Sequence, residues 1–250
     1  MNIENQLPIR IAGLSVSYDR KRVLSNIYAE IPGGSVVGVI GPNGAGKSTL
    51  FKALLGLIDV NAGKVEIFGK SVEEGRQFIA YIPQRDDVDW QFPATVIDIV
   101  LMGRYPRKHW YQRLDKHDHT IAREALKALG IMELERRQIG ELSGGQQQRV
   151  FIARALCQGS DIFLLDEPFV GVDITTEQKI ISILKQLAAE GKTMLVVHHD
   201  LTSVEQYFNQ VIMLNQRLVA FGSTASTFTK ENIASAYGPQ LNILHKTGVL

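Results

Sequence analysis

Cysteine is almost absent from this sequence: its 250 residues include only Cys157, so no disulfide can form within the chain. A chain without disulfides fits the reducing environment of the cytosol. Long hydrophobic runs are also missing, because no stretch approaches the roughly 18 apolar residues that indicate a membrane span. Any role at a membrane must therefore come through a partner chain.

The sequence also lacks an excess of either charge. Lys and Arg number 27 and Asp and Glu 26, which gives a formal net charge of +1. Binding to nucleic acid without sequence preference depends on a basic surface, so we expect no nucleic-acid partner. Low-complexity segments, charge blocks and internal repeats are missing too. The chain is long enough to bury a sizeable core.

Short apolar runs predict the buried strands of a parallel sheet, at residues 35–40, 162–165 and 193–197. Alternation of apolar and polar residues from Ile9 to Tyr18 predicts a strand with one buried face. The other expected strands are residues 23–31, 65–68, 211–214 and 217–221, the last two joined as a hairpin. The expected helices are residues 47–57, 146–157, 176–189 and 200–208, the last capped by Asp200.

Helical character dominates the middle of the chain, where Ile121, Ala125 and Leu129 share one helix face. We expect residues 94–159 to form a helical subdomain, inserted into an α/β core made of residues 1–93 and 160–250. The predicted fold is a mainly parallel α/β sheet with an antiparallel N-terminal portion and this helical insertion.

A glycine-rich loop separates the buried strand at residues 35–40 from the helix that starts near Lys47. It fits the pattern G-x-x-x-x-G-K-[ST], whose backbone N–H groups surround phosphate oxygens at the positive end of a helix. Lys47 would contact the terminal phosphates of ATP, and the hydroxyl of Ser48 would bind Mg²⁺. The alternative is a glycine-rich turn without a ligand. The residues expected to bind ATP in this segment are Gly41, Pro42, Asn43, Gly44, Ala45, Gly46, Lys47, Ser48 and Thr49.

Two carboxylates, Asp166 and Glu167, end the apolar strand at residues 162–165. In phosphate-loop enzymes the first acid of such a pair holds Mg²⁺, and we assign that role to Asp166. Glu167 would polarise the attacking water as a general base or a water-positioning residue. An acidic turn after a strand is common, so the pair is informative because it occurs together with the glycine-rich loop.

A second glycine-bearing segment, residues 142–146 (Leu-Ser-Gly-Gly-Gln), opens another predicted helix and could form a second anion site. Since the chain already has one phosphate-binding loop, this signature segment needs a nucleotide held by another copy. We expect a head-to-tail homodimer in which Ser143, Gly144, Gly145 and Gln146 close over the partner's ATP. The alternative is an ordinary helix start with Ser143 as its cap.

These motifs, in this order, make the chain resemble the nucleotide-binding subunits of ABC transporters over nearly its full length. The resemblance implies a single P-loop cassette, and two active ATP sites for each homodimer. It further implies that Tyr18 stacks on adenine, Gln84 contacts Mg²⁺ or water, His199 hydrogen-bonds the γ-phosphate, and Asp173 lies in a loop crossing the dimer interface. The alternatives are a core tyrosine for Tyr18 and a helix-start histidine for His199.

Within that family the chain is most similar to ATPases of bacterial manganese, zinc and iron importers, through residues 89–96, 101–105, 198–200 and the tail around Tyr237. This implies a peripheral protein on the cytoplasmic face of the membrane, bound to separate multi-span permease subunits and indirectly served by an extracytoplasmic metal-binding protein. Trp90 and Phe92 are expected to contact the permease; the alternative is that both rings belong to the core.

Other functions remain open from the sequence. The transported substrate could be a siderophore, haem or a lipid, because the ATPase motifs do not separate these from a metal ion. A soluble ABC protein acting on ribosomes or DNA is a further alternative, although such proteins usually carry two cassettes or a coiled-coil insertion. His117 and His119, beside Asp115 and Asp118, resemble metal ligands, but we interpret this stretch as a solvated helix face.

Overall fold

The computed structural model describes residues 6–19, 21–109 and 111–238. The strands are β1 (Ile9–Tyr18), β2 (Lys21–Ile31), β3 (Val36–Ile40), β4 (Ala62–Ile67), β5 (Ile79–Ile82), β6 (Ile162–Asp166), β7 (Thr193–Val197), β8 (Gln210–Leu214) and β9 (Leu218–Ser223). The α-helices are α1 (Lys47–Leu54), α2 (Val72–Gly75), α3 (Val96–Leu101), α4 (Lys116–Ala128), α5 (Gly144–Gln158), α6 (Ile174–Ala189), α7 (Val204–Tyr207), α8 (Thr224–Thr227) and α9 (Lys230–Tyr237). Short 3₁₀ helices are η2 (Arg76–Phe78), η3 (Arg85–Asp87), η4 (Met102–Arg107), η5 (Met132–Leu134) and η6 (Ile139–Glu141).

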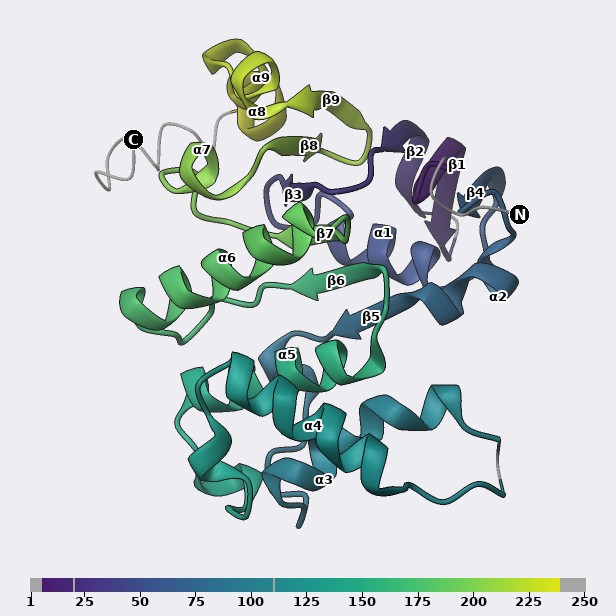
Figure 1. Cartoon of the computed structure of the whole chain (residues 1–250). Coiled ribbons are helices and arrows are strands. Elements are labelled where there is room, and N and C mark those ends of the chain that lie inside the picture. The colour runs from purple at the N-terminus through teal and green to yellow at the C-terminus, as the bar shows by residue number, and fades with distance from the viewer. Residues whose placement is uncertain (1–5, 20, 110, 239–250) are drawn as a thin grey trace.

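The strands form two sheets, as Figure 1 shows. A six-stranded sheet has the order β5-β6-β7-β3-β8-β9; its pairs are parallel except for the hairpin β8–β9. A three-stranded antiparallel sheet has the order β2-β1-β4. The expected mainly parallel α/β sheet with an antiparallel N-terminal portion is therefore confirmed.

The large sheet is buried on both faces, which explains why its strands are continuous apolar runs. All five residues of β3 are buried, and their side chains alternate between two hydrophobic clusters. Val36 and Ile40 pack in the cluster that includes the helices between β5 and β6. Val37 and Val39 pack in the other cluster, with α1 and the small sheet. The sheet is thus a rigid layer between two cores.

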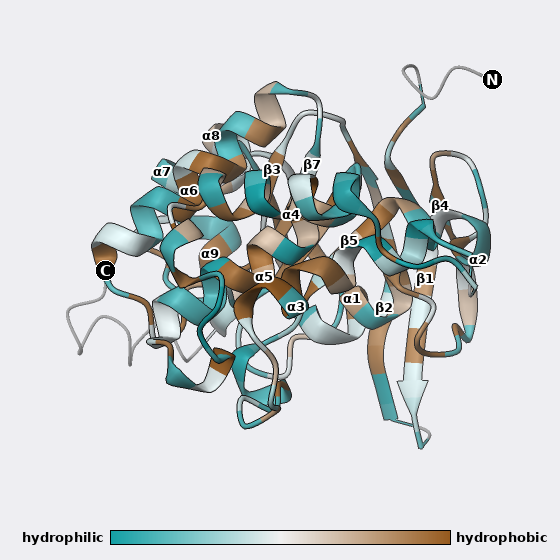
Figure 2. Cartoon of the chain, turned by 60° about the horizontal axis from the view of Figure 1, so that its bottom comes forward, coloured by the Kyte–Doolittle hydropathy of each residue, from teal (hydrophilic) through white to brown (hydrophobic). Residues whose placement is uncertain are grey.

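Helices α3, α4 and α5 follow β5 and precede β6, and lie together at the bottom of Figure 1. Helix α5 is tied to β5, because Arg154 Nη2 donates to the carbonyl oxygen of Tyr81 at 3.0 Å and Gln158 Nε2 donates to that of Ile79 at 2.9 Å. Figure 2 shows hydrophobic colour along α5 near the centre of that view. The chain thus has the helical insertion expected from the sequence.

Two sequence expectations are wrong in detail. Helix α7 is only Val204–Tyr207, because Asp200 accepts hydrogen bonds from the Thr202 N–H and the Ser203 hydroxyl in a turn rather than capping a helix. Asp118 is completely buried, whereas we expected a solvated face.

Asp118 forms ion pairs with Arg104 at 2.9 Å and Lys108 at 2.6 Å. Burial disfavours its charge, but the hydrogen bonds from Lys108, Arg104 and the N–H of Asp115 hold the pKa of Asp118 well below its usual range. This carboxylate therefore anchors η4 on the start of α4. Among the described residues no helix is long and apolar enough to cross a bilayer.

Candidate nucleotide-binding site

Four neighbouring parallel strands end at one edge of the large sheet, in the order β5-β6-β7-β3. The residue two positions beyond β5 is Gln84, β6 ends in Asp166 and continues into Glu167, and His199 follows β7. The glycine-rich loop, residues 41–48, follows β3. Since the carboxyl ends of parallel strands meet at the same edge, the fold gathers these sequence motifs in one place, as expected for ligand sites in α/β sheets.

The glycine-rich loop has the shape of a phosphate-binding loop. Gly46 precedes α1 with φ 98°, a left-handed conformation that favours glycine, and a Cβ there would lie 2.5 Å from a methyl carbon of Leu24. The ammonium of Lys47 folds back onto the loop and donates to the carbonyl oxygens of Gly41 (2.8 Å) and Pro42 (3.1 Å). A pocket of about 310 Å³ opens here, lined by residues 43–49, Val23 and Glu167.

Lys47 supplies a buried cation at this pocket. Lys47 is 8% exposed, and burial lowers the pKa of its ammonium, while the carboxylates of Glu167 and Asp166 oppose that shift. A phosphate group would supply negative charge beside this ammonium and the positive end of α1. The loop is therefore built to accept phosphate.

The buried carboxylate of Asp166 is a candidate ligand for a cation. Its side chain is buried, and its Oδ1 atom has no hydrogen-bond partner in the described structure. Burial raises the pKa of this carboxyl; a hydrogen bond from the Ser48 hydroxyl opposes the shift and the negative charge of Glu167 adds to it. A buried carboxylate oxygen without a partner is costly unless a ligand satisfies it. Carboxylate and hydroxyl oxygens, such as those of Asp166 and Ser48, are the hard donors that Mg²⁺ prefers.

Glu167 lines the pocket directly after this acid. Its backbone has φ 50°, an uncommon conformation for a residue with a side chain, which turns the chain sharply at the end of β6. The amide Nε2 of Gln84 donates to its Oε2 at 3.1 Å. The structure therefore joins two residues that are 83 positions apart in the sequence, and places a carboxylate in the lining of the pocket.

The signature segment begins α5. Ser143 caps the helix, its hydroxyl accepting from the Gln146 N–H at 3.4 Å while Gln146 Oε1 accepts from the Ser143 N–H at 2.9 Å. The helix-cap reading of Ser143 is thus correct. It does not replace the anion-site reading, because the N–H groups of Gly144 and Gly145 lie in the first turn, where helices leave donors unpaired. Within the chain this segment lies against Gly171, whose carbonyl oxygen would be 3.1 Å from a Cβ on Gly144.

The remaining predicted residues do not line this pocket. Tyr18, at the end of β1, is 42% exposed, which argues against a core role. Asp173 caps α6 by accepting from the Thr176 N–H at 3.0 Å. His199 is exposed, whereas its neighbour His198 is buried.

The two adjacent histidines have different environments. Burial, assisted by the charge of His199, lowers the pKa of His198 to about 4, so this ring is neutral at pH 7. Its Nε2 lies 2.7 Å from the Ser203 hydroxyl, and Phe169 packs edge to face against it at 5.5 Å between ring centroids. His198 therefore fills the core beneath the site, and His199 is the histidine free to reach a ligand.

The two aromatic residues expected to contact a permease differ from each other. Phe92 is 51% exposed. Trp90 is half-buried: its ring packs against Phe151 of α5 with centroids 5.2 Å apart, and its Nε1 donates to the carbonyl oxygen of Arg85 at 2.9 Å. Trp90 is thus partly packed against the core, and Phe92 is the more exposed of the two; contact with a permease stays a prediction for both residues.

Sequence reasoning missed the support that the C-terminal helix gives to the phosphate-binding loop. Tyr237 of α9 is buried, and this burial raises its pKa to about 12. Asn215 Nδ2 donates to the carbonyl oxygen of Ala236 at 2.9 Å, and the Gln216 N–H donates to that of Ala45 at 2.9 Å. The signal in the sequence is an aromatic residue that ends an amphipathic helix, a pattern typical of packing.

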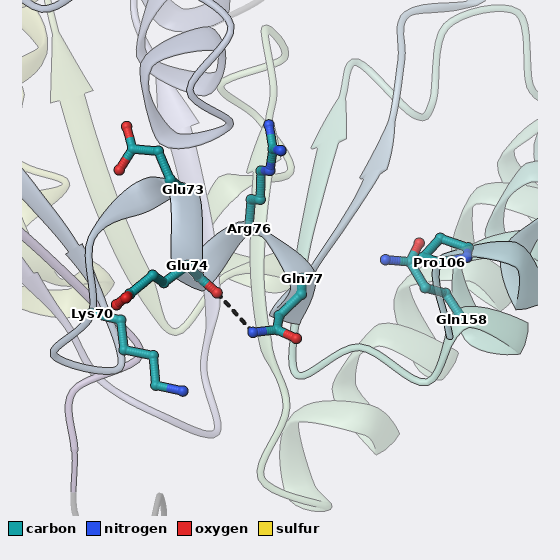
Figure 3. Close-up of a pocket in the computed structure, with 7 residues that line it drawn as sticks. All are labelled: Lys70, Glu73, Glu74, Arg76, Gln77, Pro106 and Gln158. Carbon is teal, nitrogen blue, oxygen red and sulfur yellow. Dashed lines mark hydrogen bonds between the residues drawn. The ribbon is translucent and has the colours of Figure 1, made fainter. Parts of the chain in front are cut away.

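A larger pocket, of about 740 Å³, lies away from these motifs (Figure 3). One wall comes from α2 and η2, with Glu73, Glu74 and Arg76; the other comes from Pro106 of η4 and Gln158 of α5. Its charges have both signs, and none of the predicted site residues lines it. In the described part of the chain no group of three or more His, Cys, Asp or Glu residues could hold a metal ion.

Known proteins are similar to this chain in sequence and in fold. The family model of the ABC transporter matches residues 24–170. The manganese transport system ATP-binding protein MntB of Bacillus subtilis is 48% identical over 237 residues, which cover 95% of both chains. The zinc transport system ATP-binding protein TroB of Treponema pallidum is 49% identical over 234 residues, covering 94% of this chain and 88% of TroB.

Solved structures agree with these relatives. A nucleotide-free ATP-binding cassette from an ABC transporter superposes with a TM-score of 0.78 at 26% identity, covering 93% of this chain and 96% of that one. Another cassette, in its ADP conformation, gives a TM-score of 0.77 at 25% identity and covers 95% and 97%. With its phosphate-binding loop, its acidic strand end and its signature segment, the chain belongs to the ABC transporter family and is one of its ATP-hydrolysing cassettes.

Proposed function

We propose that the chain powers an importer of a divalent metal ion, with manganese the first expectation and zinc or iron next, through a separate membrane permease. The observation that carries the metal assignment is the identity of 48–49%, over more than nine-tenths of this chain, with proteins named for manganese and zinc transport. The ATPase itself is supported by four parallel strands that end at one edge of the sheet, where the loop after β3 and Glu167 after β6 line one pocket.

ATP binds with its phosphates in the loop at residues 41–48, and Tyr18 lies against the adenine ring. The ammonium of Lys47 neutralises charge on the β- and γ-phosphates. The Ser48 hydroxyl, Asp166 and Gln84 would hold Mg²⁺, which would screen the phosphate charge. The unpaired buried oxygen of Asp166 supports this assignment. His199 hydrogen-bonds the γ-phosphate.

Hydrolysis uses the carboxylate of Glu167. Water attacks the γ-phosphorus, its proton passes to Glu167, and the bond between the γ-phosphorus and the bridging oxygen breaks to give ADP and inorganic phosphate. The hydrogen bond from Gln84 holds this carboxylate beside the pocket. A carboxylate that is already oriented in this way loses little conformational freedom when ATP binds.

Two copies act together in this proposal, each signature segment closing over the ATP of the partner, with Asp173 near the interface. Closure moves the helices between β5 and β6 and drives the permease into its alternate state; hydrolysis reopens the dimer. The protein works at the cytoplasmic face of the membrane, and an extracytoplasmic metal-binding protein delivers the ion to the permease. We expect no nucleic acid in the cycle.

The metal assignment predicts a growth phenotype. A strain without this gene should grow poorly in chelated medium, and added manganese, or failing that zinc or iron, should restore growth. Uptake of radiolabelled manganese should fall in parallel, and the chain should co-purify with a multi-span protein. If no divalent metal restores growth and manganese uptake is unchanged, the importer assignment is wrong although the ATPase assignment stands.

Phe92 and Trp90 should separate contact with the permease from packing in the core. Phe92→Ala removes a ring that is 51% exposed, so we expect transport to collapse while the melting temperature and the ATPase rate of the isolated subunit stay near wild type. Trp90→Ala removes a ring packed on Phe151 and should cost about 2–4 kcal/mol of folding stability. Thermal melting and vesicle transport assays test both variants. Normal transport in the Phe92 variant would contradict the proposed contact.

A further inference from the structure

Arg85 joins three functional segments of the cassette. It directly follows Gln84, the residue bound to Glu167, and its Nη2 donates to Oε1 of Gln147 in α5 at 3.3 Å. Its Nη1 would lie 3.0 Å from a Cβ on Gly144 of the signature segment and 3.1 Å from a Cβ on Gly171. One guanidinium therefore touches the segment after β5, the start of α5 and the loop that follows Glu167.

The surrounding residues fix the orientation of this side chain. The carbonyl oxygen of Arg85 accepts from Trp90 Nε1 at 2.9 Å, and the guanidinium carbon lies 6.0 Å from the centroid of the Trp90 ring, within reach of a cation–π interaction. Gln147 is 3% exposed, and its Nε2 donates to the carbonyl oxygen of Ile139 at 3.1 Å. That bond directs Oε1 of Gln147 toward Arg85.

Gly144 and Gly171 pack closely against the guanidinium of Arg85. A Cβ on Gly144 would meet Nη1 of Arg85 and also lie 3.1 Å from the carbonyl oxygen of Gly171, so the three groups pack with no space for another side chain. The planar, multi-donor guanidinium is suited to such a position, because it can bond Gln147 while its face covers backbone. A lysine would keep the charge but not this geometry.

We propose that Arg85 is a positioning residue: it holds the signature segment in the conformation that acts on the ATP of the partner copy, and links that segment to Gln84. Within its own chain Arg85 does not line the pocket at the phosphate-binding loop. Its charge lies behind the first turn of α5 and adds to the positive end of that helix. This inference rests on the head-to-tail dimer of the proposed function.

The proposal predicts that the defect of an Arg85 variant appears in the partner's site. Arg85→Ala should lower ATPase activity about 10²-fold, the effect of a displaced site element. The affinity of the monomer for a fluorescent ATP analogue should remain within two-fold of wild type, because the phosphate-binding loop is intact. The Lys47→Ala variant, in contrast, has a defective phosphate-binding loop and an intact signature segment.

Mixing these two inactive variants is the decisive experiment. In a dimer of Arg85→Ala with Lys47→Ala, one site combines the intact loop of the first with the intact signature segment of the second. Random pairing of equal amounts makes half the dimers mixed, so activity should recover to about a quarter of wild type. If the mixture stays inactive while the control mixture below recovers, Arg85 acts on its own Gln84 and Glu167, and the inference is wrong.

The control mixture pairs Lys47→Ala with Ser143→Arg, which blocks the signature segment at an exposed position. Its recovery establishes composite sites independently of Arg85. If it too stays inactive, the dimer of the proposed function is wrong and this inference falls with it.

Two further variants guard against a folding artefact. Arg136→Ala removes an exposed arginine and should keep full activity. Arg85→Lys should fold, melt near wild type and show activity between Arg85→Ala and wild type; full activity in either Arg85 variant would overturn the proposal.

Discussion

Replacement of Lys47 by alanine should abolish ATP hydrolysis. Lys47 is 8% exposed and its ammonium donates to the carbonyl oxygens of Gly41 and Pro42, so the ammonium already lies inside the loop that takes the phosphates. Without it, the negative charge on the β- and γ-phosphates would face the carboxylates of Asp166 and Glu167 with no cation from the loop. We expect both the affinity for ATP and the rate of hydrolysis to fall.

Phosphate release and titration with a fluorescent nucleotide measure the two effects of Lys47→Ala. Lys52→Ala is the matched control, because Lys52 lies on the same helix α1 but is exposed. The control should hydrolyse ATP normally. Hydrolysis near the wild-type rate in the Lys47 variant would mean that residues 41–48 are a structural turn, and the site would have to be sought elsewhere.

Much of the fold could be predicted because buried parallel strands have a simple signature. A strand covered on both faces must be apolar throughout, and the predicted range for β7 coincides with the observed Thr193–Val197. The hairpin β8–β9 was predictable from the polar turn between two apolar runs, and Gln216 takes the left-handed backbone, φ 57°, that such a turn requires.

The errors arise where a side chain finds a partner far away in the sequence or forms a local turn. Asp118 looked like part of a polar helix face, but Arg104 and Lys108 come from the segment before α4 and make its burial possible. Asp200 was interpreted as a helix cap, but it binds the Thr202 N–H in a turn, so the helix starts later. A local sequence pattern predicts neither the distant ion-pair partners of Asp118 nor the turn at Asp200.

The site could be predicted in its parts but not in its contacts. Motif spacing identified the phosphate-binding loop and the acids Asp166 and Glu167. The contact between Gln84 and Glu167 depends on β5 pairing with β6, and that strand order is a property of the whole sheet. Nothing in the sequence distinguishes Arg85, because an arginine in a polar segment is ordinarily solvated.

Replacement of Glu167 by glutamine should separate ATP binding from hydrolysis. Glutamine has nearly the shape of glutamate, so it can remain beside Gln84 and preserve the turn at φ 50°. It cannot accept the proton of the attacking water, and hydrolysis should slow by roughly 10²–10⁴, the usual contribution of a positioned acid or base. Binding should persist or tighten, because one negative charge has left the pocket that receives the phosphates.

If hydrolysis reopens the dimer, ATP should then hold the Glu167→Gln variant in the closed state. Sedimentation with and without ATP measures this: a monomer alone, and a dimer with ATP that persists until nucleotide is removed. Glu190→Gln, an exposed acid-to-amide change far from the site, should stay monomeric after ATP is consumed. Because the dimer requires both a loop that holds ATP and a signature segment that covers it, Ser143→Arg added to the Glu167 variant should abolish trapping without abolishing ATP binding. A Glu167→Gln protein that turns over normally, or that never dimerises with ATP, would contradict both the role of the carboxylate and the composite site.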